Sequence, residues 1–258
     1  MSPPELQRLR EAGLLGELDL QFAALMCRLA DDESRELALG AALASNWSTG
    51  GHVCLELERV AGRGLAPEHP DLVAPELADW IPALAESPVV GAPGDYRPLI
   101  LDPAGRLYLH RYWRYESELA ANLAARAGES VAGLDRERLA AGLRELFPAQ
   151  TGIRPDWQQL AAAQALLRRF CVVSGGPGTG KTSTVVRILA LLRQQPGGAR
   201  LKIALAAPTG KAAARMQESI RAAKQRLGLA PELIAAIPDA AQTLHRLLGW
   251  RPDGAGYR

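Results

Sequence analysis

The chain has 258 residues, 48% hydrophobic and 22% charged, which is enough apolar material for one large or two modest globular domains. Its three cysteines, Cys27, Cys54 and Cys171, are far apart and form no C-x-x-C pair, which argues against a zinc ribbon, a redox dithiol and a disulfide framework. The first residues lack the apolar run of a signal peptide, and no stretch approaches the length of a membrane span. We therefore expect a soluble cytoplasmic protein without a membrane partner.

The net charge of +2 conceals a strong asymmetry between the two halves of the chain. Residues 1–150 contain 14 Arg, no Lys and 23 acidic residues, a net charge of −9, whereas residues 151–258 contain 16 basic and 5 acidic residues, a net charge of +11. A basic module is typical of proteins that bind polyanions, because its cations release the counterions of phosphates. A second domain with a basic face that is balanced by an acidic neighbouring domain, and that binds no polyanion, would give the same net charges. We expect a domain boundary at residue 150, where the charge balance changes sign.

The predicted elements of the first domain are mostly helices. Helices are expected over 18–29, 35–44, 112–127 and 135–146, a short buried segment over 51–57, and a hairpin that joins 99–101 to 107–109. Breaker residues over 46–51 end the second helix, and prolines and glycines are scattered over 62–98. His52, His69 and His110 show no ligand pattern, and we interpret them as structural residues.

The second domain has the alternating pattern of a parallel sheet covered by helices. The predicted elements are a helix over 156–168, a strand over 170–173, a glycine loop over 175–182, a helix over 181–194, a strand over 202–206 and a helix over 211–227. The expected fold class is therefore α/β. A mostly helical amino-terminal domain with a small hairpin precedes the first part of a parallel-sheet domain.

The glycine loop has the composition of a phosphate-binding loop. It consists of Gly175, Gly176, Pro177, Gly178, Thr179, Gly180, Lys181 and Thr182, which fits G-x-x-x-x-G-K-[ST]. Glycines let backbone N–H groups approach a triphosphate, and the following helix points the positive end of its dipole at the phosphates.

The loop therefore predicts an ATP site with two candidate catalytic residues. Lys181 is expected to reach the β- and γ-phosphates, and the Thr182 hydroxyl to ligate Mg²⁺. A glycine turn without a ligand is the alternative. A dinucleotide fingerprint does not fit, because Ser183 stands where its third glycine is required.

Gln158 precedes the strand that enters the loop, in a helix that would cross the adenine pocket. A glutamine amide offers an acceptor and a donor, which suits the N6 and N7 edge of adenine. An exposed helical glutamine is the alternative interpretation. By chemistry alone, the neighbouring Gln159 is an equal candidate.

A second polar turn follows the second strand of this domain. Ligands of open α/β sheets bind beyond the carboxyl ends of the strands, so Thr209, with Lys211 and Arg215 on one helical face, is a candidate for contacts to phosphate. Simple capping of the helix by Thr209 is the alternative.

A further candidate segment contains Thr243 and His245. A lone histidine such as His245 would ordinarily be structural.

Motors with such a loop also need an acidic strand end that holds Mg²⁺ and orients water. The one apolar run after the loop that ends in an acid covers residues 233–239. Pro238 argues against a central strand there, and Ala240 stands where a glutamate is required. We therefore reject this run, and we expect the chain to hold phosphates and Mg²⁺ without a hydrolytic acid.

These motifs together resemble the RecD family, the alpha subunits of bacterial exodeoxyribonuclease V (RecBCD), which are superfamily 1 DNA helicases. The segments similar to its nucleotide and DNA motifs are 156–158, 174–182, 206–215 and 243–249. Segments 19–23, 51–55 and 106–111 are similar to its amino-terminal domain, which docks the subunit onto its complex. The resemblance covers essentially the whole chain and favours Gln158 over Gln159 as the adenine reader.

The resemblance implies a docking domain over 1–150 and part of a RecA-like P-loop NTPase domain over 151–258. It implies an ATP-dependent 5′ to 3′ translocase on single-stranded DNA, the helicase subunit of a helicase–nuclease for double-strand break repair by recombination, with RecB-like and RecC-like partners. The residues implied in DNA contacts are Thr209, Lys211, Arg215, Thr243 and His245. The family continues through an acidic motif, a second RecA-like domain and an arginine finger, so an amino-terminal fragment is also implied.

Two other functions stay open from the residues. A docking and nucleotide-binding module that does not hydrolyse ATP would fit the missing acid. A small-molecule phosphotransferase would share the loop, but it would leave the first domain and the +11 charge of the second without a role.

Overall fold

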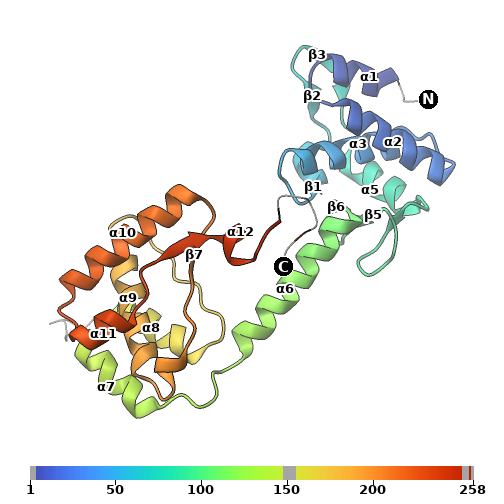
Figure 1. Ribbon diagram of the computed structural model, residues 1–258. Helices are drawn as coiled ribbons and strands as arrows, with labels where there is room; N and C mark the ends of the chain where they lie inside the picture. The colour runs from blue at the N-terminus through green and yellow to red at the C-terminus, as the bar shows by residue number, and fades with distance from the viewer. Residues whose placement is uncertain (1–3, 148–154, 252–255, 257–258) are drawn as a thin grey trace. The chain divides into compact units, whose positions relative to one another are not determined.

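The computed structural model describes residues 4–147, 155–251 and 256 (Figure 1). Its packing divides the chain into two compact units, Met1–Asn122 and Leu123–Arg258, each with its own hydrophobic core. The division lies within one continuous helix, α6. Among the described residues, no helix has both the length and the apolar character needed to cross a membrane.

The first unit combines helices with a small mixed sheet. Its helices are α1 (Pro4–Glu11), α2 (Glu17–Ala30), α3 (Arg35–Thr49), α4 (Leu57–Val60), α5 (Leu77–Glu86) and the first part of α6 (His110–Gly128). Its strands are β1 (Leu55–Glu56), β2 (Gly64–Ala66), β3 (His69–Val73), β4 (Val90–Gly91), β5 (Leu99–Leu101) and β6 (Arg106–Leu109). One sheet has the order β1-β6-β5-β4, and its β5 and β6 are the predicted hairpin, whereas β2 and β3 form a separate pair.

Helix α3 lies at the centre of this unit. It contacts α2, α5, β1 and β6, and its residues 37–45 are buried. Gly40 permits the close approach of α5, because a Cβ there would lie 3.1 Å from Leu84 Cδ2. Trp80 of α5 is fully buried, and its indole N–H donates to the Glu36 carbonyl at 2.9 Å. The apolar face of α5 is therefore anchored on α3 by packing and by one hydrogen bond.

Two predictions for this unit were wrong in detail. The break expected over 46–51 begins only at Gly50, because the hydroxyls of Ser48 and Thr49 donate to carbonyls one turn earlier and so remain compatible with helix. Helix α5 was missed within 62–98, because Pro82 lies inside it. A proline inside a helix removes one backbone hydrogen bond, but burial against α3 stabilises the helix nonetheless.

The second unit contains a parallel strand pair, as expected for an α/β fold, but only one of its two strands is among those that the sequence predicts. Its helices are α7 (Arg136–Leu146), α8 (Trp157–Leu167), α9 (Lys181–Gln194), the 3₁₀ turn η1 (Gly198–Arg200), α10 (Gly210–Arg226), α11 (Pro231–Ala236) and α12 (Leu244–Leu247). Its strands β7 (Leu205–Ala207) and β8 (Ala241–Thr243) are parallel, with Ala207 opposite Thr243. Helix α9 contacts α7, α8, α10 and α11, so it is the central helix of this core.

The strand expected over 170–173 is not formed, which corrects the prediction. A strand requires hydrogen bonds to a neighbour, and the described strand β7 pairs with β8 instead. Val172 is 74% exposed, so the apolar run is not a core segment here. Strand β7 itself begins at Leu205, later than the predicted 202–206.

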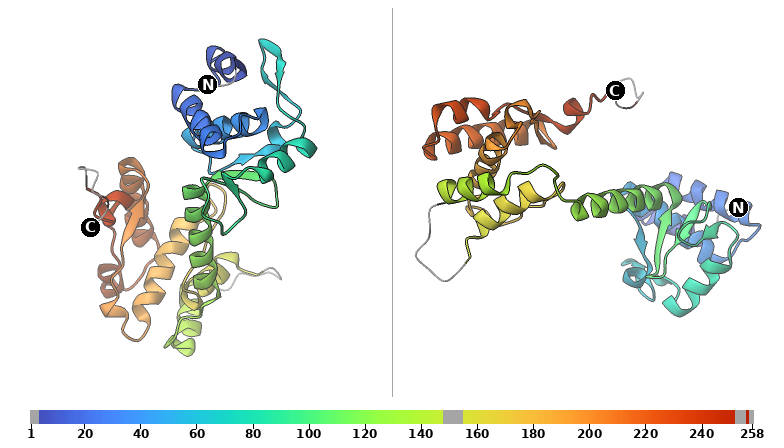
Figure 2. Two further views of the ribbon diagram at one scale, coloured as in Figure 1. Left: turned by 90° about the vertical axis from the view of Figure 1, so that its right-hand side faces the viewer. Right: turned by 90° about the horizontal axis from the view of Figure 1, so that it is seen from below.

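Helix α7 belongs to the second unit, whereas the charge pattern assigns it to the first. It packs on α8 and α9 (Figure 2), and Leu139, Leu146 and Phe147 lie in the core of that unit. Gly142 permits the close packing, because a Cβ there would lie 2.6 Å from Leu191 Cδ2 of α9. The predicted boundary at residue 150 falls among residues 148–154, which lie outside the described residues.

The buried carboxylate of Asp19 joins α2 to α3. It is 3% exposed and accepts hydrogen bonds from Ser45 Oγ at 2.6 Å, Asn46 Nδ2 at 3.1 Å and the Gly16 N–H at 2.8 Å. Removal of the carboxylate would leave these donors without this acceptor. We expect Asp19→Ala to lower the free energy of unfolding by about 3 kcal/mol, as an unpaired buried donor costs about 1 kcal/mol or more.

Urea unfolding followed by circular dichroism measures this loss. Glu58→Ala removes an exposed carboxylate from the same unit and is the control. The control should change the free energy of unfolding by less than about 0.5 kcal/mol. Equal losses in the two variants would contradict the role given to Asp19.

Candidate functional site

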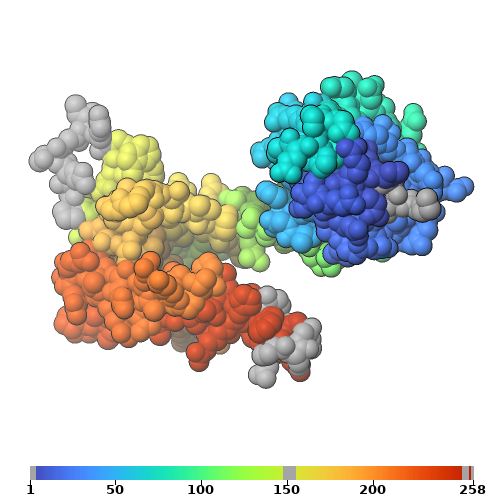
Figure 3. Space-filling view, turned by 90° about the horizontal axis from the view of Figure 1, so that it is seen from above, coloured from blue at the N-terminus to red at the C-terminus, as the bar shows by residue number. Residues whose placement is uncertain are grey.

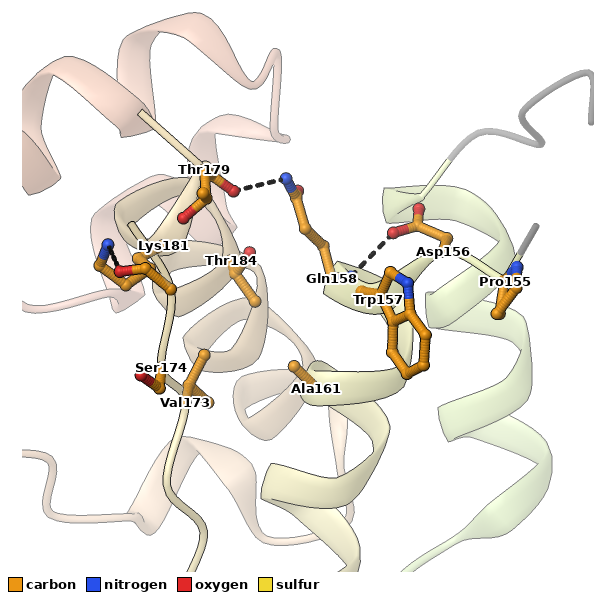
Figure 4. A pocket seen from close by; sticks show the side chains of 11 residues that line it. Pro155, Asp156, Trp157, Gln158, Ala161, Val173, Ser174, Thr179, Lys181 and Thr184 are labelled. Atoms are coloured by element: carbon orange, nitrogen blue, oxygen red, sulfur yellow. Dashed lines mark hydrogen bonds between the residues drawn. The ribbon is translucent and has the colours of Figure 1, made fainter. Parts of the chain in front are cut away.

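A pocket of about 440 Å³ lies between α8 and the glycine loop that precedes α9 (Figure 4). Its walls come from two segments, residues 155–161 and 173–184. Gln158, Gly175, Thr179 and Lys181 are among the lining residues, so the structure brings the predicted phosphate loop and the predicted adenine reader to one place.

The loop is tight because its glycines adopt backbone conformations that other residues avoid. Gly178 and Gly180 have φ values of +76° and +81°. A side chain at Gly180 is also excluded by contact, since a Cβ there would lie 2.5 Å from Gln158 Nε2. At Gly175 a Cβ would lie 2.7 Å from Thr179 Oγ1, which itself donates to the Gly176 carbonyl at 2.9 Å.

Lys181 is the first residue of α9, and its side chain turns back over the loop. Its ammonium Nζ donates to the carbonyls of Gly175 and Gly176 at 2.5 and 2.6 Å. The ammonium and the amino-terminal end of α9 therefore place positive charge at the same side of the pocket. This arrangement can stabilise an anion.

Thr182 is half-buried in the first turn of α9, and it offers one hydroxyl oxygen to a hard cation. Within the described part of the chain, no group of three or more His, Cys, Asp or Glu side chains is placed to hold a metal ion. Asp156 lines the pocket, but its Oδ1 caps α8 by accepting from the N–H groups of Gln158 and Gln159 at 2.9 and 3.2 Å. The described residues thus fit Mg²⁺ that is held mainly by phosphates and water. Thr182 is not among the residues that line the pocket, and its hydroxyl remains a predicted ligand.

The two neighbouring glutamines of α8 point in different directions. Gln158 Nε2 donates to the Thr179 carbonyl at 3.1 Å (Figure 4), whereas Gln159 Nε2 donates to the Leu143 carbonyl of α7 at 3.4 Å. Gln158 therefore faces the loop and the pocket, and Gln159 faces a neighbouring helix. The contacts of the two side chains thus distinguish Gln158 from Gln159, although both carry the same amide group.

Arg187, one helical turn beyond the pocket wall on α9, was missed by sequence reasoning. Its Nη1 donates to Gln158 Oε1 at 3.1 Å, and its guanidinium lies over the ring of Phe147, 4.8 Å from the centroid. A single arginine within an otherwise apolar stretch of helix was the available signal. Its partner could not be read from the sequence, because Gln158 lies 29 positions away.

The predicted DNA-side residues lie at the carboxyl ends of β7 and β8. The parallel register places Ala207 opposite Thr243, so the turn with Thr209 and the start of α12 lie at the same edge. Both threonines cap helices: Thr209 Oγ1 accepts from the Ala212 N–H, and Thr243 Oγ1 accepts from the Arg246 N–H, each at 3.2 Å. Capping, the alternative interpretation for Thr209, is therefore observed.

The side chains around these caps lie at the surface. Lys211 and Arg215 are exposed and one turn apart on α10, the helix in orange on the face shown in Figure 3. The His245 ring contacts the Trp250 ring edge-on, with the centroids 5.7 Å apart.

The sequence did not predict strand β8, because its residues, Ala-Gln-Thr, form no apolar run.

Asp239 is paired with α10 and does not follow a strand. Arg221 Nε lies 2.7 Å from its carboxylate, and this hydrogen bond lowers the pKa of Asp239. Residues 231–236 before it form helix α11, which confirms the rejection of a central strand at that point.

Comparisons with known proteins divide the chain in a similar way. The profile of the family "RecBCD enzyme subunit RecD, N-terminal domain" matches residues 11–108, and the profile "AAA domain" matches residues 158–258. The chain is 42% identical over 259 residues to the RecBCD enzyme subunit RecD of Mycobacterium tuberculosis, covering 96% of this chain and 41% of that protein.

Two further relatives extend the comparison. The RecBCD enzyme subunit RecD of Haemophilus influenzae is 31% identical over 274 residues, which cover 95% of this chain and 42% of that protein. An ATP-dependent RecD2 DNA helicase of Deinococcus radiodurans is 34% identical over 153 residues, 58% of this chain and 18% of that protein. The chain thus spans about two fifths of the length of the RecD subunits it matches. With both domain profiles and this similarity across nearly all of its residues, the chain belongs to the RecD family.

Proposed function

We propose that this chain binds ATP with Mg²⁺ and contacts DNA as part of an ATP-dependent DNA helicase subunit. One observation carries the proposal, namely that Gln158, Lys181 and the glycine loop converge on a single pocket. The names of the relatives, a RecBCD subunit and an ATP-dependent DNA helicase, support a motor function.

In this proposal the pocket binds ATP through groups that each serve one part of the nucleotide. The backbone N–H groups of the loop, residues 175–182 apart from Pro177, and the Lys181 ammonium bind the phosphates, and Gln158 contacts adenine. Thr182 ligates Mg²⁺, which neutralises charge on the phosphates when it is bound. Lys181 would exchange its hydrogen bonds to the loop carbonyls for bonds to phosphate oxygens.

For the whole protein we propose ATP hydrolysis coupled to 5′ to 3′ movement on single-stranded DNA. The complex would be a RecBCD-type helicase–nuclease, an exodeoxyribonuclease V, that repairs double-strand breaks by recombination, with RecB-like and RecC-like subunits as partners. In this proposal residues 1–150 dock onto the complex and residues 151–258 contribute to the motor. A bacterial cytoplasmic location follows, because that is where such a complex meets chromosomal DNA. The RecD relatives are themselves subunits of RecBCD enzymes, which supports this assembly.

Thr209, Lys211, Arg215, Thr243 and His245 are the proposed DNA contacts. Exposed cations at the carboxyl edge of β7 and β8 can neutralise phosphates of any sequence. The threonine hydroxyls already accept hydrogen bonds from backbone N–H groups, yet each hydroxyl can still donate to a phosphate oxygen.

Lys181→Ala should weaken the binding of ATP–Mg²⁺ by at least about tenfold. The reason is that a charge-assisted hydrogen bond contributes about 1.5–3 kcal/mol. Isothermal titration calorimetry on the 258-residue chain measures the effect. Lys202→Ala removes an exposed lysine of the same unit and should leave the affinity unchanged. Unchanged binding in Lys181→Ala would remove the loop as the nucleotide site.

The double variant Lys211→Ala/Arg215→Ala should weaken binding to single-stranded DNA. The slope of log K against log salt concentration should fall by about 1.4, as each phosphate contact contributes about 0.7 on single strands. Fluorescence anisotropy with a labelled oligothymidylate at several salt concentrations measures both quantities. Arg200→Ala/Lys202→Ala removes the same charge from the opposite end of β7, so a matching change in that control would contradict a specific contact.

A further inference from the structure

The amide of Gln158 is held from both sides by groups of the second unit. Its Nε2 donates to the Thr179 carbonyl of the loop at 3.1 Å, and its Oε1 accepts from Arg187 Nη1 of α9 at 3.1 Å. The two contacts are chemically different, because a carbonyl can only accept and a guanidinium can only donate. Rotation of the amide by half a turn would therefore oppose donor to donor and acceptor to acceptor, so only one orientation satisfies both neighbours.

The Arg187 guanidinium is itself fixed by its surroundings. It lies 4.8 Å from the centroid of the buried Phe147 ring, whose face attracts a cation. Its Nε is buried and has no hydrogen-bond partner among the described residues, so Gln158 Oε1 is a principal polar contact of this side chain. A lysine could not reproduce the arrangement, because a compact ammonium lacks the planar fork that both stacks and donates.

We propose that Arg187 is a positioning residue that fixes the orientation of the Gln158 amide and thereby makes the pocket selective for adenine over guanine nucleotides. This inference rests on the proposed ATP site and adds to it a determinant of base choice. Phe147, the residue that follows α7, contributes to this positioning, because its ring contacts the Arg187 guanidinium.

The selectivity follows from the valences that the two contacts leave free. The amide oxygen accepts two hydrogen bonds and the amide nitrogen donates two, so one acceptor and one donor remain for a base. Adenine presents the N6 donor and the N7 acceptor on one edge, which match this pair, whereas guanine presents two acceptors, O6 and N7. With the amide fixed, one guanine acceptor must face the amide oxygen. Without Arg187, only the hydrogen bond to the Thr179 carbonyl opposes rotation of the amide, and an amide that gives up this one bond can turn its NH₂ group toward the guanine acceptors.

Calorimetric binding of ATP, GTP and inorganic tripolyphosphate to the 258-residue chain tests this inference. The variants are Arg187→Met, which keeps an apolar stem, and Arg187→Lys, which keeps the charge. We expect each variant to reduce the ratio of ATP to GTP affinity by about tenfold, the factor that corresponds to one hydrogen bond to a charged group. Tripolyphosphate affinity should stay at the wild-type value, because the phosphate loop is not altered.

Three further variants separate positioning from general damage. Gln158→Ala should reduce the ATP to GTP ratio as well, and the addition of Arg187→Met to it should cause no further change, since both act through one amide. Gln159→Ala, whose side chain contacts α7, should bind all three ligands as the wild type does. If Arg187→Met does not fold, Arg187→Lys, alone and added to Gln158→Ala, decides the outcome in its place.

The outcomes distinguish this inference from the proposal on which it rests. A wild-type ratio in both Arg187 variants, or a parallel loss for all three ligands, would overturn the positioning role and leave the ATP site in place. Equal wild-type affinities for ATP and GTP would also overturn it. Failure of the wild-type chain to bind ATP and tripolyphosphate would overturn both proposals.

Discussion

The close approach of α8 to the glycine loop sets the geometry of the pocket between them. Gln158 donates to the Thr179 carbonyl at 3.1 Å across a gap so narrow that a Cβ on Gly180 would lie 2.5 Å from the amide nitrogen. Gly180 also has a positive φ, so both its conformation and its neighbour require the absence of a side chain. Because α9 begins directly after Gly180, the same contact determines where Lys181 and Thr182 stand.

The starts of α9 and α10 in the second unit therefore suit two different kinds of ligand. At α9 the groups that face the pocket are a charged side chain and the backbone, which suits a highly charged ligand of fixed shape. At α10 the threonine cap is satisfied locally, and the exposed side chains of Lys211 and Arg215 provide charge at the surface. A cavity selects its ligand by shape, whereas an exposed basic edge binds a chain of phosphates whatever its sequence.

The sequence predicted the elements that depend on local signals, and it missed those that depend on distant partners. Helix α9 and the loop follow from a glycine-rich motif, and the hairpin of β5 and β6 from two apolar runs around a turn. Helix α5 was missed because its stability comes from burial of Trp80 and Leu84 against α3, which outweighs an internal proline. The run over 170–173 lacks a described strand beside it, and no local signal reports the presence of a partner.

The position of α7 has a consequence for how the protein can be divided. Charge alone suggests a cut at residue 150, which would leave Phe147 in the acidic piece. The Phe147 ring, however, lies under the Arg187 guanidinium, and Gly142 seats α7 closely on α9. A piece that begins at residue 151 would keep every residue of the glycine loop but lose the Phe147 ring on which the Arg187 guanidinium lies. A boundary chosen from charge thus separates α7 from the helices on which it packs, whereas a boundary chosen from packing keeps Phe147, Arg187 and Gln158 in one piece.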